Sequence, residues 1–286
     1  MQLVNFVRCV SIIIYSFFFN NWVIYSQWVN EPFHAFGTLP FLNADCVKKA
    51  QISHLNGKIY TKLPGEMIVK TEGFVKYQFN SLGQTISMVS YRPYLTFKDS
   101  ICYFFKYSEG HLIEIKTIRK KDYTIQLFTY SNDKLVNSEE HIGLLSTGKE
   151  IQTNSLLYSY YNMGDDRYTI VSYKSGNPYK QIRKSYDSLQ HLTFEESIDY
   201  ISQDTITTQY TYDANANLIL KQINGGARIE ETSLIYQSNK ELEAIKHYRN
   251  GELKDETQII YHNGNQALSS VIHFDHLTKL MEIIRF

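Results

Sequence analysis

The stretch Thr208-Gln209-Tyr210-Thr211-Tyr212-Asp213-Ala214-Asn215-Ala216-Asn217-Leu218-Ile219-Leu220 decides the fold of this chain. Two apolar arms flank a centre of turn-forming residues, which is the pattern of a β-hairpin. The outline of this hairpin recurs along the chain at nearly even intervals. The sequence therefore predicts an array of hairpins and not a scaffold built around one catalytic site.

An aromatic residue that closes one strand of each hairpin marks the repeat, and we call these residues the markers. Successive markers are 28, 23, 30, 26, 26, 24 and 25 residues apart, a period that holds two strands and two turns. We therefore predict an all-β fold, an antiparallel meander of about eight repeated β-hairpins that forms a long twisted or curled sheet. The markers are Phe79, Tyr107, Tyr130, Tyr160, Tyr186, Tyr212, Tyr236 and Tyr261.

Two further features follow the markers through the repeat. The residue two positions before each marker shares its face of the strand, and Lys184 is the one polar residue among the eight. A turn residue follows three or four positions after every marker except Tyr186, where Leu189-Gln190 stands instead. We expect function where the repeat breaks, around Tyr186 and in the segment 273–276. The turn residues are Gly83, Gly110, Asp133, Gly164, Asn215, Asn239 and Gly264.

The composition of the 286 residues supports this fold class. Tyr and Phe number 23 and 16 against 14 Gly and 5 Pro, which favours half-buried strands. Basic and acidic residues are equal at 29 each, so no broad cationic field favours nucleic acid. We expect no nucleic-acid partner.

The chain divides into three predicted parts. Residues 1–26 combine Arg8, an apolar run and small residues near Ser26, which indicates a cleaved signal peptide, with an uncleaved membrane anchor as the alternative. Residues 27–50 are an irregular lead-in, where a helix over 44–50 capped by Asn43 and the start of a first strand both remain open. Residues 51–286 form the repeat domain.

Cys46 and Cys102 remain after the predicted cleavage. An even number of cysteines in an exported chain allows one disulfide. Two separate thiols are the equal alternative, because the sequence gives no distance between them.

The stretch Tyr212-Asp213-Ala214-Asn215-Ala216-Asn217-Leu218 resembles the tyrosine-aspartate (YD) repeat of bacterial Rhs proteins and animal teneurins. Ala216 takes the place of the family's glycine, Tyr186-Asp187 repeats the opening pair, and residues 79–83 repeat the glycine spacing. The resemblance extends loosely over residues 75–274. It implies a strand-turn-strand unit and an exported setting; eight units are too few for the sealed shell that this family builds.

Few residues suggest chemistry. His262, His273, Asp275 and His276 form the densest cluster of metal-ligand types, but on a strand His276 points away from His273 and Asp275, so surface histidines are the simpler interpretation. No nucleophile elbow, P-loop or dinucleotide fingerprint occurs. We therefore assign no catalytic, cofactor-binding or metal residue and expect no cofactor, although paired carboxylates without a local motif leave a hidden enzyme open.

The sequence thus predicts a non-enzymatic β-repeat protein of a Gram-negative bacterium. It is expected to be secreted, periplasmic or on the cell surface, as a structural or binding module with a protein or glycan partner and no membrane insertion after signal cleavage. One alternative is a carbohydrate-binding or carbohydrate-processing protein with exposed tyrosines. Another is an outer-membrane β-barrel, against which stand charges on both faces of segments such as 228–231 and 253–256.

Overall fold

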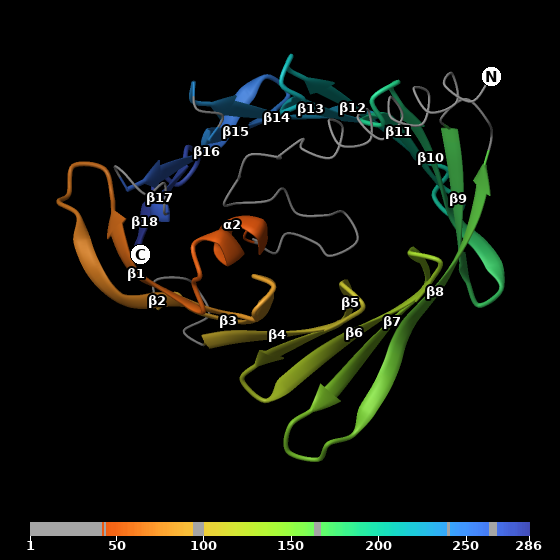
Figure 1. Ribbon diagram of the computed structural model, residues 1–286, viewed down its shortest axis with the longest axis horizontal. Helices are drawn as coiled ribbons and strands as arrows, with labels where there is room; N and C mark the ends of the chain where they lie inside the picture. Colours follow the sequence, from red (N-terminus) through yellow and green to blue (C-terminus); the bar gives the residue numbers. More distant parts are fainter. Residues whose placement is uncertain (1–41, 43, 94–99, 163–166, 239–240, 263–267) are drawn as a thin grey trace, which may run out of the picture.

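The computed structural model describes residues 42, 44–93, 100–162, 167–238, 241–262 and 268–286. The predicted signal peptide, its predicted cleavage site and the predicted helix cap Asn43 lie outside these residues. Within them the chain forms one short helix and eighteen strands (Figure 1). The elements are α2 (Ala44–Lys49), β1 (His54–Lys62), β2 (Val69–Phe79), β3 (Thr85–Tyr91), β4 (Ser100–Ser108), β5 (His111–Arg119), β6 (Asp122–Ser131), β7 (Lys134–Leu144), β8 (Glu150–Asn162), β9 (Arg167–Lys174), β10 (Asn177–Tyr186), β11 (Leu192–Asp199), β12 (Thr205–Tyr212), β13 (Leu218–Gly225), β14 (Arg228–Tyr236), β15 (Leu242–Arg249), β16 (Glu252–Tyr261), β17 (Leu268–Asp275) and β18 (Met281–Arg285).

The sheet closes into a barrel, which corrects the predicted open, curled sheet. Each strand pairs antiparallel with the next, and β1 pairs with β18 in a register that runs from Lys58 opposite Arg285 to Lys62 opposite Met281. The eight predicted hairpins are β2–β3 to β16–β17, and β1 and β18 are additional strands. Closure follows because the final segment forms β18, which pairs with β1. Closure of the ring removes both edges of the sheet.

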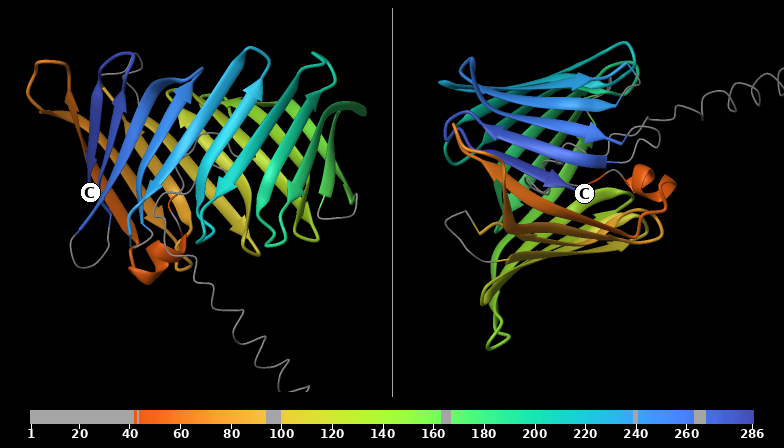
Figure 2. Two further views of the ribbon diagram at one scale, coloured as in Figure 1. Left: turned by 90° about the horizontal axis from the view of Figure 1, so that it is seen from above. Right: turned by 90° about the vertical axis from the view of Figure 1, so that its left-hand side faces the viewer.

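The two ends of the barrel differ. In the described part of the chain, the turns that follow the markers lie at one end, which we call the marker mouth, and the other turns form the distal mouth (Figure 2). Helix α2 lies at the marker mouth, so of the two open alternatives for this part of the lead-in the helix is correct. Gly83 backs directly onto it, because a Cβ there would stand 2.0 Å from the Ala44 carbonyl oxygen.

The marker tyrosines join neighbouring hairpins. The Tyr212 hydroxyl donates a hydrogen bond of 2.9 Å to the Leu192 carbonyl oxygen, which belongs to the preceding repeat. Tyr236 makes the same 2.9 Å bond to Leu218. Because each hydroxyl satisfies a backbone acceptor across the hairpin boundary, these tyrosines hold the array in register. The same bond recurs from Tyr107 to Thr85, from Tyr160 to Leu135 and from Tyr261 to Leu242.

The aspartate after a marker caps its own turn. One Asp213 carboxylate oxygen accepts the backbone amides of Asn215 and Asn217 at 2.8 and 2.9 Å, an Asx turn. Asp187 accepts the amides two and four residues ahead in the same way, both at 2.9 Å. Gln190 then has φ +64°, matching the +65° of Ala216. The expected lapse of the turn after Tyr186 is therefore a change of residue type and not of backbone geometry.

The wall has an inner face that carries the core. Ile59, Val75 and Ile115 are fully or almost fully buried on that face, and Val47 of α2 packs in the same cluster. Cys46 lies in this cluster too, whereas the pairing register puts Cys102 on the outer face. The two cysteines are not joined by a disulfide, which decides between the two alternatives.

Two glycines let the wall bend sharply at β1 and β2. A Cβ on Gly57 would stand 2.5 Å from the Ile284 side chain, and one on Gly73 would stand 3.2 Å from the Ile59 Cβ. Both positions face the interior, where any larger residue would push the strands apart. This is the curved end of the oval at the left of Figure 1.

Candidate functional site: the barrel interior

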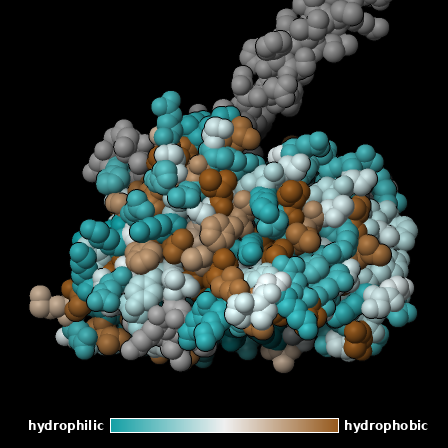
Figure 3. Space-filling view, turned by 90° about the horizontal axis from the view of Figure 1, so that it is seen from below, coloured by the Kyte–Doolittle hydropathy of each residue, from teal (hydrophilic) through white to brown (hydrophobic). Residues whose placement is uncertain are grey.

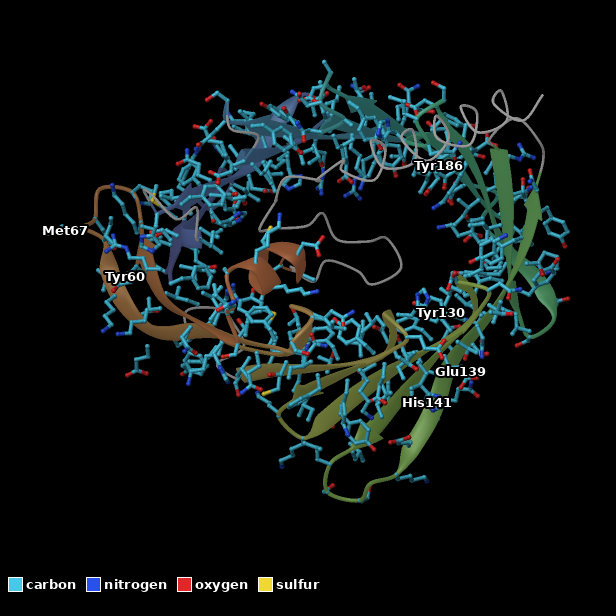
Figure 4. The ribbon with its side chains drawn as sticks, in the orientation of Figure 1. Tyr60, Met67, Tyr130, Glu139, His141 and Tyr186 are labelled. Atoms are coloured by element: carbon cyan, nitrogen blue, oxygen red, sulfur yellow. The ribbon has the colours of Figure 1, made fainter. Side chains whose placement is uncertain are left out.

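The inner face near the marker mouth is apolar and aromatic. The markers and the residues two positions before them form two successive layers there, and Figure 4 shows Tyr130 and Tyr186 on the inner side of the wall. Phe105 and Phe128 are buried in the core cluster, and Tyr107 and Tyr130 pack partly buried against it. Burial raises the pKa of Tyr107 to about 12, so this hydroxyl stays neutral and acts as a donor.

The inner face becomes charged toward the distal mouth. Arg249 lies 3.3 Å from the Glu230 carboxylate, and His247 lies 3.8 Å from Asp255. The strand register puts both pairs on the same face as the core residues. Along their strands, the pairs lie three or more positions further from the marker mouth than the buried core residues do. The interior is thus apolar at one end and charged at the other.

The Arg92–Glu282 ion pair belongs to this charged part and ties distant strands together. Arg92 follows β3 and Glu282 lies on β18, with β1 and β2 between them. The guanidinium makes two hydrogen bonds of 2.9 and 3.1 Å to the carboxylate and a third to the Ser90 hydroxyl. The two side chains are 28% and 13% exposed. A bidentate ion pair in this position can both stabilise the curvature of the wall and present charge to the interior.

Lys184, which interrupts the apolar stripe, also faces the interior. Its ammonium lies 3.4 Å from the Glu195 carboxylate on β11, and Glu195 is buried. A second inner lysine, Lys221, lies over the Tyr210 ring at 6.0 Å from the ring centroid. The predicted break around Tyr186 is therefore a polar sector of the inner wall.

The candidate metal ligands do not come together. His273 faces inward and contacts the Thr257 hydroxyl at 3.0 Å, while Asp275 caps the β17–β18 turn through the amides of Leu277 and Thr278. His276 packs edge-on against Phe274 of the outer face, and His262 is exposed. Across the described residues, no group of three or more metal-ligand side chains occurs.

The outer face of the wall mixes apolar and charged residues. Arg183 and Glu196 form an ion pair of 2.7 Å in mid-strand on this face, and Glu139 contacts His141 at 3.3 Å. Figure 3 shows polar and apolar side chains interspersed over the lower wall of Figure 1. No helix in the described part of the chain is long and apolar enough to cross a membrane. Further charged residues in the middle of outer strand faces are Lys76, Lys116 and Lys246.

Comparisons with known proteins identify no family. No family model and no curated protein matches the sequence. Among solved structures, a porin-like protein from Bacteroides vulgatus is 14% identical over 80% of this chain and 95% of its own, with a TM-score of 0.32. A porin-like protein from Bacteroides uniformis is 10% identical over 82% and 95%, with a TM-score of 0.28. A LolA superfamily protein from Nitrosomonas europaea is 10% identical over 84% and 89%, with a TM-score of 0.22.

TM-scores this low do not establish a shared fold, so function has to follow from the geometry of this chain. The resemblance to YD repeats stays a prediction. The charged inner residues Arg92, Glu230 and Glu282 had no signal in the sequence, since they face one interior only after the sheet has closed.

Proposed function

We propose that this chain is a non-enzymatic β-barrel protein of the bacterial cell envelope that binds an amphipathic molecule in its interior. One observation carries the proposal: the inner face is apolar near the marker mouth and charged near the distal mouth. A ligand with a long apolar part and a polar head matches both ends. Its apolar part gains about 25 cal/mol for each Å² removed from water, and its head meets charged groups such as Arg249.

The tyrosines support a binding interior more than a sugar-binding surface. The marker hydroxyls of Tyr212, Tyr236 and Tyr261 are engaged with backbone carbonyls. Stacking on a sugar requires an exposed ring face, whereas the rings of Tyr236 and Tyr261 pack against the core cluster. The rings of the markers therefore serve as packing and as lining for an apolar ligand.

An outer-membrane β-barrel is the second candidate, and closure of the sheet favours it over the open structural module expected from the sequence. A sheet in lipid needs every backbone group paired, and a closed ring provides this. The outer face favours a wall in water, because a Lys or Arg facing the bilayer midplane costs about 2–4 kcal/mol. Lys76, Lys116 and Arg183 all lie in mid-strand on that face.

A fluorescence titration with a dansyl-labelled long-chain fatty acid tests the interior site. We expect saturable binding that Ile182→Glu weakens at least fivefold, because Ile182 faces the interior. Gln181→Glu is the matched control. Gln181 is the neighbour of Ile182 on the same strand, its side chain faces outward, and the substitution adds the same charge. No binding, or equal loss in both variants, contradicts the proposal. Recovery of the native protein in alkali-washed membranes instead of the soluble fraction would establish the second candidate.

A further inference from the structure

The hairpin between β1 and β2 ends in a tip, which we define as residues 63–69, where four exposed apolar side chains surround one acid, Glu66. Turn tips of soluble proteins are usually polar, and an exposed apolar cluster marks an interaction site. Met67 projects at the extreme of this hairpin in Figure 4. Lys62 and Lys70 flank the tip on either side. The exposed fractions are 45% for Leu63, 84% for Met67, 47% for Ile68 and 55% for Val69.

Other turns of the same mouth share this character. Leu144 and Leu145 are each 46% exposed at the β7–β8 turn, close to Lys149. Ile201 at the β11–β12 turn and Leu277 at the β17–β18 turn are 76% and 83% exposed. Apolar side chains thus project from the distal mouth at four separate turns around the ring. In the described turns of the marker mouth, the exposed large apolar residues are Leu82 and Leu189.

The outer wall beside the tip is basic and aromatic. Lys76 lies over the Phe74 ring at 4.9 Å, Arg285 over Tyr60 at 4.8 Å and Lys116 over Tyr123 at 4.4 Å, measured to the ring centroids. The acidic residues on the outer face of these strands are Glu72 and Glu114. The basic residues on the outer face of β18 and β1–β5 are Lys58, Lys62, Lys70, Lys76, Lys106, Lys116 and Arg285.

We propose that the distal mouth docks on the surface of an anionic lipid bilayer, with the β1–β2 tip inserted among the acyl chains. Apolar side chains flanked by lysine suit this interface, because the apolar part enters the headgroup boundary while the ammonium groups meet lipid phosphates. Each lysine near an anionic leaflet adds to the electrostatic attraction. The basic wall beside the tip favours an anionic membrane over an uncharged one.

This docking mode differs from spanning the bilayer. The mid-strand charges of the outer face stay in water when the rim alone touches lipid. It also gives the charged end of the interior a position next to the headgroups, from which an amphipathic ligand would enter. Docking deepens the proposed binding function but does not depend on it, since the tip and the interior are tested with separate probes.

Co-sedimentation of the full chain with lipid vesicles tests the docking surface. One set of vesicles contains phosphatidylglycerol and phosphatidylcholine, and a second contains phosphatidylcholine alone. We expect binding to the first set that is at least tenfold stronger than to the second and that falls steeply with salt. The double variant Met67→Asp, Ile68→Asp should lose at least tenfold in affinity for the anionic vesicles. The control Leu82→Asp, Leu189→Asp adds the same two charges at the marker mouth and should keep wild-type affinity.

The outcomes separate the possible occupants of the surface. Equal loss in the two double variants, or equal binding to both vesicle sets, overturns the proposal. A dimer in light scattering that Met67→Asp, Ile68→Asp dissociates, together with no vesicle binding, assigns the tip to a second copy of this chain and also overturns it. Unchanged fatty-acid titration of the tip variant in the absence of vesicles shows that its fold is intact. Absence of fatty-acid binding by the wild-type protein, with vesicle binding retained, would refute the proposed function and leave docking standing.

Discussion

Replacing Gly83 by alanine should release α2 from the marker mouth. Gly83 has φ +79°, and a Cβ there would stand 2.0 Å from the Ala44 carbonyl oxygen and 2.9 Å from the Lys48 amide nitrogen. Both neighbours are backbone atoms, so the helix has to move. Val47 and Cys46 of α2, which are 0% and 4% exposed, lose their burial when it does. Exposing one buried valine costs about 1.5–3 kcal/mol.

Gly110→Ala is the matched control for this prediction. Gly110 has φ +86°, yet no atom lies within 4 Å of the position of its Cβ. Each variant thus bears the left-handed backbone penalty of about 1–2 kcal/mol, while Gly83→Ala alone meets the helix. The difference between the two variants isolates the contact with α2.

The assay is the rate at which a thiol reagent modifies Cys46 in a Cys9→Ser, Cys102→Ser background. We expect Gly83→Ala to raise this rate at least tenfold and Gly110→Ala to leave it near the wild-type value. Urea unfolding should show that both variants lose stability, with the larger loss at Gly83. Equal modification rates in the two variants would refute the packing of Gly83 against α2.

Three further predictions concern the repeat and the closure. Tyr212→Phe should lower the free energy of unfolding, measured with urea, by about 1 kcal/mol because the Leu192 carbonyl loses its donor. The control Tyr161→Phe should change it much less, because the Tyr161 hydroxyl has only a long 3.5 Å contact with Tyr173. Hydrogen bonds from the His191 amide and from the other donors around the Asp187 carboxylate hold the pKa of Asp187 below its usual range. Wild type should therefore be more stable than Asp187→Asn at pH 7, and this advantage should disappear as the pH falls below about 3.9 and through the folded-state pKa. An advantage that grows in acid would contradict this. Removing residues 281–286 exposes the edges of β1 and β17, so gel filtration should show oligomers, and a stable monomer would show that closure is dispensable.

The sequence predicted the repeat because its signals are local. Alternation, the marker tyrosines and turn residues such as Gly83 and Gly110 act over a few positions, and the eight hairpins follow from them. Closure depends on the pairing of β1 with β18, which joins residues such as Lys58 and Arg285 more than 200 positions apart. No local pattern specifies such a contact.

The candidate site was harder to predict because it depends on which face becomes the inside. Charges occur on both faces of strands such as β14, where Glu230 faces inward and Glu231 outward. The alternation shows that Glu230 and Glu231 lie on opposite faces of the strand, but it does not show which of the two faces the interior. The sequence alone identifies Lys184 as a break in the apolar stripe, whereas its ion-pair partner Glu195 follows only from the pairing of β10 with β11.

The closing pair of strands has a consequence for how the molecule assembles in time. Each hairpin can zip onto its neighbour as soon as both are available, because these contacts are close in sequence. Strand β1 has to wait until β18 has formed before its second partner exists. Ring closure is therefore expected to be the last and slowest folding step. Before the ring closes, a chaperone that shields the unpaired edge of β1 would improve the yield of folded protein.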